Sequence, residues 1–253
     1  MRIRAACLIL AALVFIYTLL ITPTFTQEIP SIPQIAPGET VVAEISDSQV
    51  EHRYRFAALA NEIVVIEMRS LDRSFHNPLW APVLVLLDAN GAVLADTTAA
   101  YSVDDARIVA ELLHAGEYTI IATREGGAQG ESFGGFELTL MQVPLLGMGV
   151  AVEDSLSSDE GIRYYAVRAG QDFRLNYQHQ EGDFFPQVAL HRLDEAEGGL
   201  REVAVVRGRE MEEVVFGTFA ANTTYILTLH ESDTEFNSTP VRLEYRIEVV
   251  FVS

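Results

Sequence analysis

The sequence predicts an all-β protein, with two tandem, jelly-roll-like antiparallel β-sandwich domains after an N-terminal signal or anchor segment. Short apolar runs separated by turn residues recur along the chain, which is typical of sandwiches and barrels. No long segment has the 3.6-residue period of an amphipathic helix. The order of the runs repeats after about 110 residues, which indicates a duplication.

Composition limits the classes of partner and chemistry. The formal net charge of −19 repels nucleic acid and anionic lipid, so we expect no nucleic-acid partner. A solvated acidic surface is the simplest explanation of this charge. The only cysteine, Cys7, lies in the N-terminal leader, so the rest of the chain has no disulfide and depends on its apolar core.

Residues 1–26 are predicted to be a signal peptide or a membrane anchor. Arg2 and Arg4 precede an uncharged apolar run, residues 5–21, and a polar exit follows, which permits cleavage after Thr26. The run is of borderline length for spanning a bilayer, so an uncleaved anchor is the alternative. In both cases the remainder is expected outside the cytoplasm, secreted or extracytoplasmic, with membrane contact only through an uncleaved N-terminal segment.

Residues 27–38 contain three prolines and no periodicity, which predicts an extended linker. The first sandwich is expected over residues 39–143. The apolar runs and alternating segments predict strands at 41–45, 53–56, 63–66, 83–87, 92–95, 108–112, 118–122 and 136–140.

Three segments of this domain carry more specific information. Residues 63–66 are continuously apolar, as in a strand covered on both faces. Asn90-Gly91 supplies the positive φ angles of a tight hairpin turn. Residues 126–135 contain five glycines, but no helix is expected after them, so a phosphate-binding loop is not indicated.

The second domain, residues 144–253, repeats the order of the first. Tyr54 is aligned with Tyr164, and Tyr118 with Tyr225, at nearly constant offsets. The second copy alternates clearly in residues 173–177 and in its last strand, residues 243–251, so seven or eight strands per copy are expected.

Five segments of the first domain form a recognisable series of motifs: Tyr54-Arg55-Phe56, Ala60-Asn61-Glu62, residues 86–91, Asp105-Ala106-Arg107-Ile108 and residues 116–120. In these segments the chain resembles the bacterial pre-peptidase C-terminal (PPC) domain family, and the second domain matches in part. The resemblance implies a jelly-roll-like sandwich of the kind appended to secreted enzymes or surface proteins. Some members of that family bind collagen, polysaccharide or calcium.

Two groups of residues are candidates for ligand binding. Asp96, Asp104 and Asp105 flank one loop, and calcium prefers several oxygen ligands, so this loop is a candidate calcium site or a solvated acidic loop. No other cofactor is indicated. Trp80 is the only tryptophan and is expected in a loop, where it would serve as a platform for a sugar ring or, as we favour, as a lid on the core.

The motifs do not indicate an enzyme. The six histidines are scattered without the spacing of a zinc site. Residues 130–134 match the Gly-x-Ser-x-Gly pattern, but a nucleophile elbow needs a helix after it, and no helix is expected after this glycine-rich stretch. Asp183, Glu195 and Glu197 include spacings that could mimic a glycosidase pair, but with 36 acidic residues such pairs occur by chance. No catalytic residue is therefore assigned, and a hydrolase is the remote alternative.

The sequence thus predicts an exported, non-enzymatic β-sandwich protein that acts as an interaction or adhesion module at the cell surface or envelope. Its expected partner is a protein or polysaccharide at that surface. The alternative is a carbohydrate- or polymer-binding module, for which calcium is a candidate cofactor but not a required one. The sequence gives no oligomeric state.

Overall fold

The computed structural model describes residues 31–71, 79–97, 105–157, 161–168, 172–182, 186–194, 199–206, 213–219, 223–231 and 242–251. Pro33–Ser253 forms one compact unit. The described residues form antiparallel strands and a single short 3₁₀ helix, η1 (Gly127–Gln129). None of the described residues belongs to a helix that is long and apolar enough to cross a membrane.

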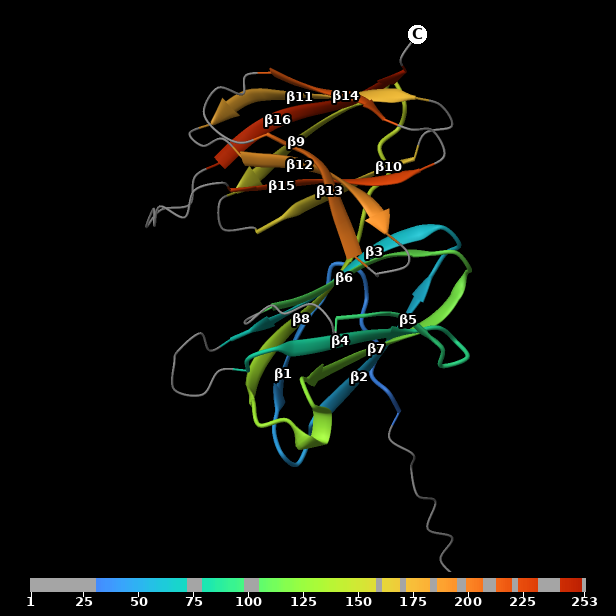
Figure 1. The fold of residues 1–253 in the computed structure, drawn as a ribbon, viewed down its shortest axis with the longest axis vertical. Helices are drawn as coiled ribbons and strands as arrows, with labels where there is room; N and C mark the ends of the chain where they lie inside the picture. The colour runs from blue at the N-terminus through green and yellow to red at the C-terminus, as the bar shows by residue number, and fades with distance from the viewer. Residues whose placement is uncertain are drawn as a thin grey trace, which may run out of the picture. The chain divides into compact units, whose positions relative to one another are not determined.

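Eight strands form the first sandwich (Figure 1). One sheet has the strand order β1-β8-β3-β6 and the other β2-β7-β4-β5, with antiparallel pairing throughout. Two four-stranded sheets with this connectivity make a jelly roll. The strands are β1 (Thr40–Ile45), β2 (Glu51–Ala58), β3 (Glu62–Ser70), β4 (Pro82–Leu87), β5 (Val93–Asp96), β6 (Asp105–Leu112), β7 (Gly116–Arg124) and β8 (Gly134–Gln142).

The second sandwich repeats this topology strand for strand. Its sheets have the orders β9-β16-β11-β14 and β10-β15-β12-β13, so each strand takes the place of the strand eight positions earlier. The predicted fold class, two tandem jelly-roll-like sandwiches, is confirmed. The strands are β9 (Ala151–Ser157), β10 (Arg163–Arg168), β11 (Phe173–Gly182), β12 (Pro186–Asp194), β13 (Gly199–Val206), β14 (Glu213–Phe219), β15 (Thr224–Glu231) and β16 (Arg242–Phe251).

The repetition includes the segment before each sandwich. The backbone of Arg55 in β2 bonds to residues 33–35, which lie parallel to it, with N···O distances of 2.8 and 2.9 Å. The backbone of Ala166 in β10 bonds to residues 144–146 in the same way, with both distances 2.8 Å. The proline-containing stretch before the first sandwich therefore ends as part of it, hydrogen-bonded alongside β2.

These parallel bridges also fix how the two copies align. Arg55 and Ala166 are equivalent, so Tyr54 corresponds to Tyr165 and not, as the sequence alignment has it, to Tyr164. Tyr54 and Tyr165 each lie in the core of their own sandwich. The sequence alignment is wrong by one residue here, and a slip of one residue exchanges the two faces of a strand.

Each sandwich encloses its own apolar core between its two sheets. The alternation predicted for residues 118–122 and 173–177 is confirmed, because Tyr118, Ile120, Phe173 and Leu175 are all buried there. Alternate residues of each strand thus face inward, as expected for sheets that are covered on one side.

A third apolar cluster joins the two sandwiches through the outer faces of two sheets. Ile63 and Val65 of β3 pack there with Tyr164 and Ala166 of β10. The prediction that residues 63–66 are covered on both faces is therefore confirmed. One face of the strand packs in the core of its own sandwich, and the other face packs against the second sandwich. The remaining buried members are Val109, Val143 and Ile226.

The two copies differ at the positions that make this contact. The register of the pairs β3–β8 and β11–β16 makes Val65 equivalent to Arg174, which is exposed. Tyr164 is equivalent to Arg53, which is also exposed. Each sandwich thus carries apolar side chains on the outer face that is covered and arginines on the outer face that is not.

Candidate binding end of the first sandwich

Four connections of the first sandwich lie at the same end, because the strands they join are antiparallel and alternate in direction. They are β1–β2, β3–β4, β5–β6 and β7–β8, and we call this end the loop end. Trp80 lies in the β3–β4 connection, Asp96 ends β5 and Asp105 begins β6. The jelly roll therefore brings three of the four predicted ligand-binding residues to one end, while Asp104 lies outside the described residues.

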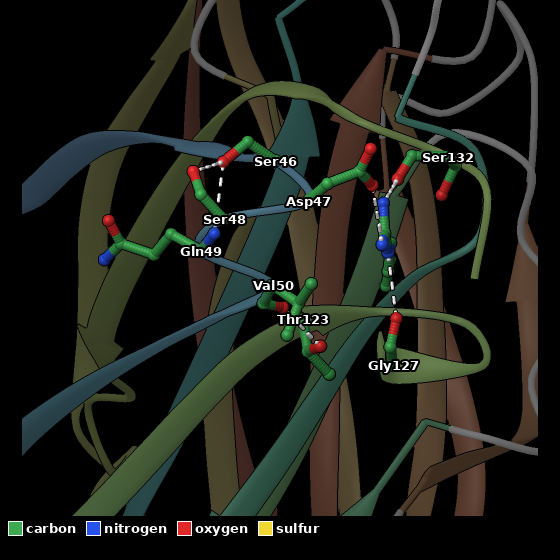
Figure 2. A network of polar contacts seen from close by, with 9 residues as sticks. Ser46, Asp47, Ser48, Gln49, Val50, Thr123, Gly127 and Ser132 are labelled. Carbon is green, nitrogen blue, oxygen red and sulfur yellow. Dashed lines mark hydrogen bonds and ion pairs between the residues drawn. The ribbon is translucent and has the colours of Figure 1, made fainter. Parts of the chain in front are cut away.

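A buried arginine holds these connections together (Figure 2). Arg124, at the end of β7, is only 2% exposed. Its guanidinium donates to the carbonyl oxygens of Gly127 and Ser132 at 2.9 and 2.7 Å, and to the Asp47 carboxylate at 3.1 Å. A buried charge is tolerated only when its donors are satisfied, so Arg124 fixes the β7–β8 connection against the β1–β2 turn.

The sequence contained a signal for Arg124 that our prediction missed. Tyr118, Ile120 and Ala122 were expected to share one face, and Arg124 is the next residue with the same parity. An arginine at an inward position must find acceptors, and the strand end places it beside loop carbonyls.

Local hydrogen bonds order the β1–β2 turn as well (Figure 2). The hydroxyl of Ser46 accepts from the Gln49 backbone at 3.2 Å and lies 3.0 Å from the Ser48 hydroxyl. The Thr123 hydroxyl donates to the Val50 carbonyl at 2.7 Å. This part of the loop end is thus preorganised, which reduces the entropic cost of binding a partner.

Trp80 is 59% exposed, so the interpretation of this residue as a lid on the core is wrong. Its neighbour Leu79 is fully buried and fills the core position instead. Ala81 then adopts a positive φ of 52°, which is uncommon for a residue with a side chain, and its carbonyl accepts from the Glu125 backbone at 3.0 Å.

Two further apolar side chains are exposed at the loop end. Leu71 is 49% exposed and Phe133 is 43% exposed. The Leu71 backbone donates to the Gly135 carbonyl at 2.9 Å, and a Cβ at Gly135 would lie 3.2 Å from a Leu71 methyl carbon. We call Leu71, Trp80 and Phe133 the apolar tip. All three side chains lie at the loop end, and exposed large apolar side chains at one end of a domain make a candidate interaction site.

The acidic candidates are on different sheets. Asp96 is exposed at the edge strand β5, and Asp105 is half-buried at the start of β6. In the ranges that the structure describes, no three His, Cys, Asp or Glu side chains gather as metal ligands. With Asp104 outside those ranges, calcium binding stays a prediction.

A cleft that the sequence did not predict lies between the outer faces of the two sandwiches. It has a volume of about 360 Å³, and its lining includes Arg107 of β6 and His191, Glu202 and His230 of the second sandwich. His191 Nε2 lies 3.0 Å from the Thr228 hydroxyl oxygen. Burial lowers the pKa of His191, and the positive charge of Arg107 adds to that effect.

The carboxylates considered for a glycosidase pair, Asp183, Glu195 and Glu197, lie outside the described residues.

Comparisons with known proteins gave no family. No protein-family model and no curated protein matches the chain. Among solved structures, the chain is similar to the CUB1-EGF-CUB2 domains of rat MASP-1, with 10% identity, a TM-score of 0.25 and coverage of 86% of this chain and 100% of that one. The corresponding values for the CUB1-EGF-CUB2 domain of human MASP-1/3 are 12%, 0.24, 82% and 99%. Likeness at this level carries no argument about function.

Proposed function

We propose that the chain is an exported, non-enzymatic interaction module that binds a protein partner at the cell surface through the loop end of its first sandwich. The observation that carries this proposal is the apolar tip. Leu71, Trp80 and Phe133 are 43 to 59% exposed at the end of the sandwich where Arg124 anchors the connections.

The chemistry of the tip suits a protein partner. Tryptophan and other aromatic side chains dominate the binding energy of protein interfaces when a pocket on the partner desolvates them. Asp47, with its side chain 91% exposed, and the exposed Asp96 provide charge at the same end of the sandwich. Charges around an apolar centre contribute mainly to specificity and to the rate of association.

Export is supported by the N-terminal pattern of Arg2, Arg4 and the apolar run over residues 5–21. The PPC-like motifs support the same role, because that family is associated with secreted and surface proteins. The polar groups at the loop end also fit binding better than catalysis. The Arg124 donors and the Ser46 hydroxyl are engaged in holding loops.

The test compares the labelled full chain with two variants for binding to isolated cell envelopes. Trp80→Ala is expected to reduce binding at least tenfold, and Val42→Ala, which truncates a 65% exposed side chain on β1, is expected to leave it unchanged. Protease treatment of the envelopes should abolish binding if the partner is a protein. Equal binding of Trp80→Ala and the parent chain would contradict the proposal.

A calcium-dependent polysaccharide module is the second candidate, favoured by the exposure of Trp80 at the same end of the sandwich as Asp96 and Asp105. Every tyrosine that the structure describes is buried, so Trp80 is the available platform for a sugar ring among the described Trp and Tyr side chains. Retention on an insoluble polysaccharide that Trp80→Ala or a chelator abolishes would favour this candidate. Binding that survives protease treatment of the envelopes would do the same.

A further inference from the structure

A groove of about 550 Å³ lies at the other end of the first sandwich, where the turns β4–β5 and β6–β7 are located. These turns alternate with the connections of the loop end, so the groove is a separate surface from the apolar tip. Leu193 of β12 completes one wall. The volume lies in the range of sites that bind ligands of drug size or a few side chains.

The groove has an apolar centre that is open to solvent. Leu94 is 44% exposed and Leu113 is 55% exposed, and both line the groove with the buried Val109. Covering such a concave apolar surface with a partner is favourable, because apolar area is removed from water.

The polar lining is acidic. Asp88, Glu111 and Glu117 contribute carboxylates, and the lining contains no lysine or arginine. Hydrogen bonds from the backbones of Ala92 and Asn90 lower the pKa of Asp88, so this group stays charged. Glu111 is already bonded to Arg168 at 2.5 Å, so Asp88 and Glu117 carry most of the attraction for a cation.

Glu117 can exchange its present partner. It forms a 3.2 Å ion pair with Arg55, and the two side chains are 51% and 43% exposed. Exposed pairs of this kind contribute little free energy, so a cation bound in the groove can compete for the Glu117 carboxylate.

The floor of the groove is preformed. The Tyr118 hydroxyl donates to the His114 carbonyl at 2.5 Å and fixes the turn before β7. The Asp88 carboxylate closes the β4–β5 turn, in which Gly91 has a φ of 81°. A ligand would therefore meet a surface that needs little rearrangement.

We propose that this groove docks a short segment of a partner protein that carries both apolar and basic residues. The segment would place apolar side chains between Leu94 and Leu113, and lysine or arginine beside Asp88 and Glu117. The two features that point to this occupant are the apolar centre and the acidic lining, which contains no lysine or arginine. This surface is independent of the binding proposed for the apolar tip.

The test measures binding of a fluorescent seven-residue peptide of lysine and leucine to the full chain by anisotropy. Saturable binding is expected, with at least tenfold weakening between 50 and about 300 mM salt because the attraction is screened. A peptide with glutamate in place of lysine should not bind, and one with serine in place of lysine should bind more weakly.

Variants locate the site. Leu113→Lys, at an exposed position, should weaken binding at least tenfold, Glu117→Gln should weaken it by about threefold, and Val42→Lys on β1 should leave it unchanged. Amide NMR shifts should change in residues 93–96. The proposal would be overturned if Leu113→Lys bound the peptide as tightly as the parent chain does. It would also be overturned if Trp80→Ala weakened peptide binding as much as Leu113→Lys does. Neither outcome bears on the envelope-binding test of the apolar tip.

Discussion

The hydroxyl of Tyr164 in the second sandwich donates a 2.7 Å hydrogen bond to Oε1 of Glu67 in the first. Glu67 is only 6% exposed and also accepts from Arg107 at 2.7 Å and from Arg69 at 2.9 Å. The Arg107 guanidinium lies 5.8 Å from the centre of the Tyr164 ring. One buried carboxylate, satisfied from both sandwiches, therefore fixes how the two outer faces meet.

Removing the Tyr164 hydroxyl should weaken this contact without disturbing the fold. Tyr164→Phe is expected to lower the free energy of unfolding by about 1–2 kcal/mol, because a hydrogen bond to a charged group is lost while both arginines still pair with Glu67. Urea denaturation measures the change. Tyr54→Phe, which removes a hydroxyl away from the interface, is the control, and equal losses in the two variants would contradict a special role for Tyr164.

A larger disturbance at the same interface should separate the sandwiches. Val65→Arg places an unpaired charge in the apolar cluster and is expected to cost about 3 kcal/mol or more. The strand itself tolerates arginine, because Arg174 occupies the equivalent position in the second sandwich. Calorimetry should show two unfolding transitions in place of one, whereas Val42→Arg on the exposed β1 position should keep a single transition.

Mutating the two partners of the Arg124–Asp47 ion pair should change the free energy of unfolding by very different amounts. Arg124→Ala leaves the carbonyls of Gly127 and Ser132 without their donors and is expected to cost about 3 kcal/mol. Asp47→Asn should cost less than about 0.5 kcal/mol, because the Asp47 side chain is 91% exposed. Hydrogen exchange should accelerate in residues 125–133 only in the arginine variant, and similar exchange in both would refute the anchoring role.

Acid should destabilise the cleft between the sandwiches. Burial holds the pKa of His191 below its usual value of 6.5, and Arg107 and His230 lower it further, while Glu202 opposes the shift. The unfolded chain therefore binds more protons at His191, so the stability that depends on this residue is present above pH 6.5 and is lost as the pH falls below it. His191→Gln should flatten the dependence of unfolding free energy on pH between 7.5 and about 5. An unchanged slope would exclude His191 as its source.

The alternation of side chains made most of the fold predictable. Phe173, Leu175 and the residues of the last strand alternate in a way that assigns faces directly, and residues 63–66 correctly indicate a strand covered twice. What covers the second face was not predictable, since Glu67 and Tyr164 are 97 positions apart and meet only when two sheets pack. Adjacent tyrosines, Tyr164 and Tyr165, fit either face, which explains the alignment error.

The loop end was less predictable because alternation stops where strands end. Leu79 and Trp80 are both apolar and lie in a loop, where no regular alternation of side chains indicates which of the two enters the core. The structure selects Leu79, so the more conspicuous residue is the exposed one. The placement of Trp80, Asp96 and Asp105 at one end follows from the jelly-roll connectivity, which groups alternate connections there.

The parallel pairing of residues 33–35 with β2 and of residues 144–146 with β10 has a mechanical consequence. A pull along the chain at either segment loads its hydrogen bonds in shear, so they must fail together and not one after another. Between the sandwiches, the hydrogen bonds of Ala166 to Pro144 and Leu146 hold the connecting segment against β10. This segment therefore has no free length that could extend under tension. Under tension, the chain would therefore transmit load from one sandwich to the other as a stiff link.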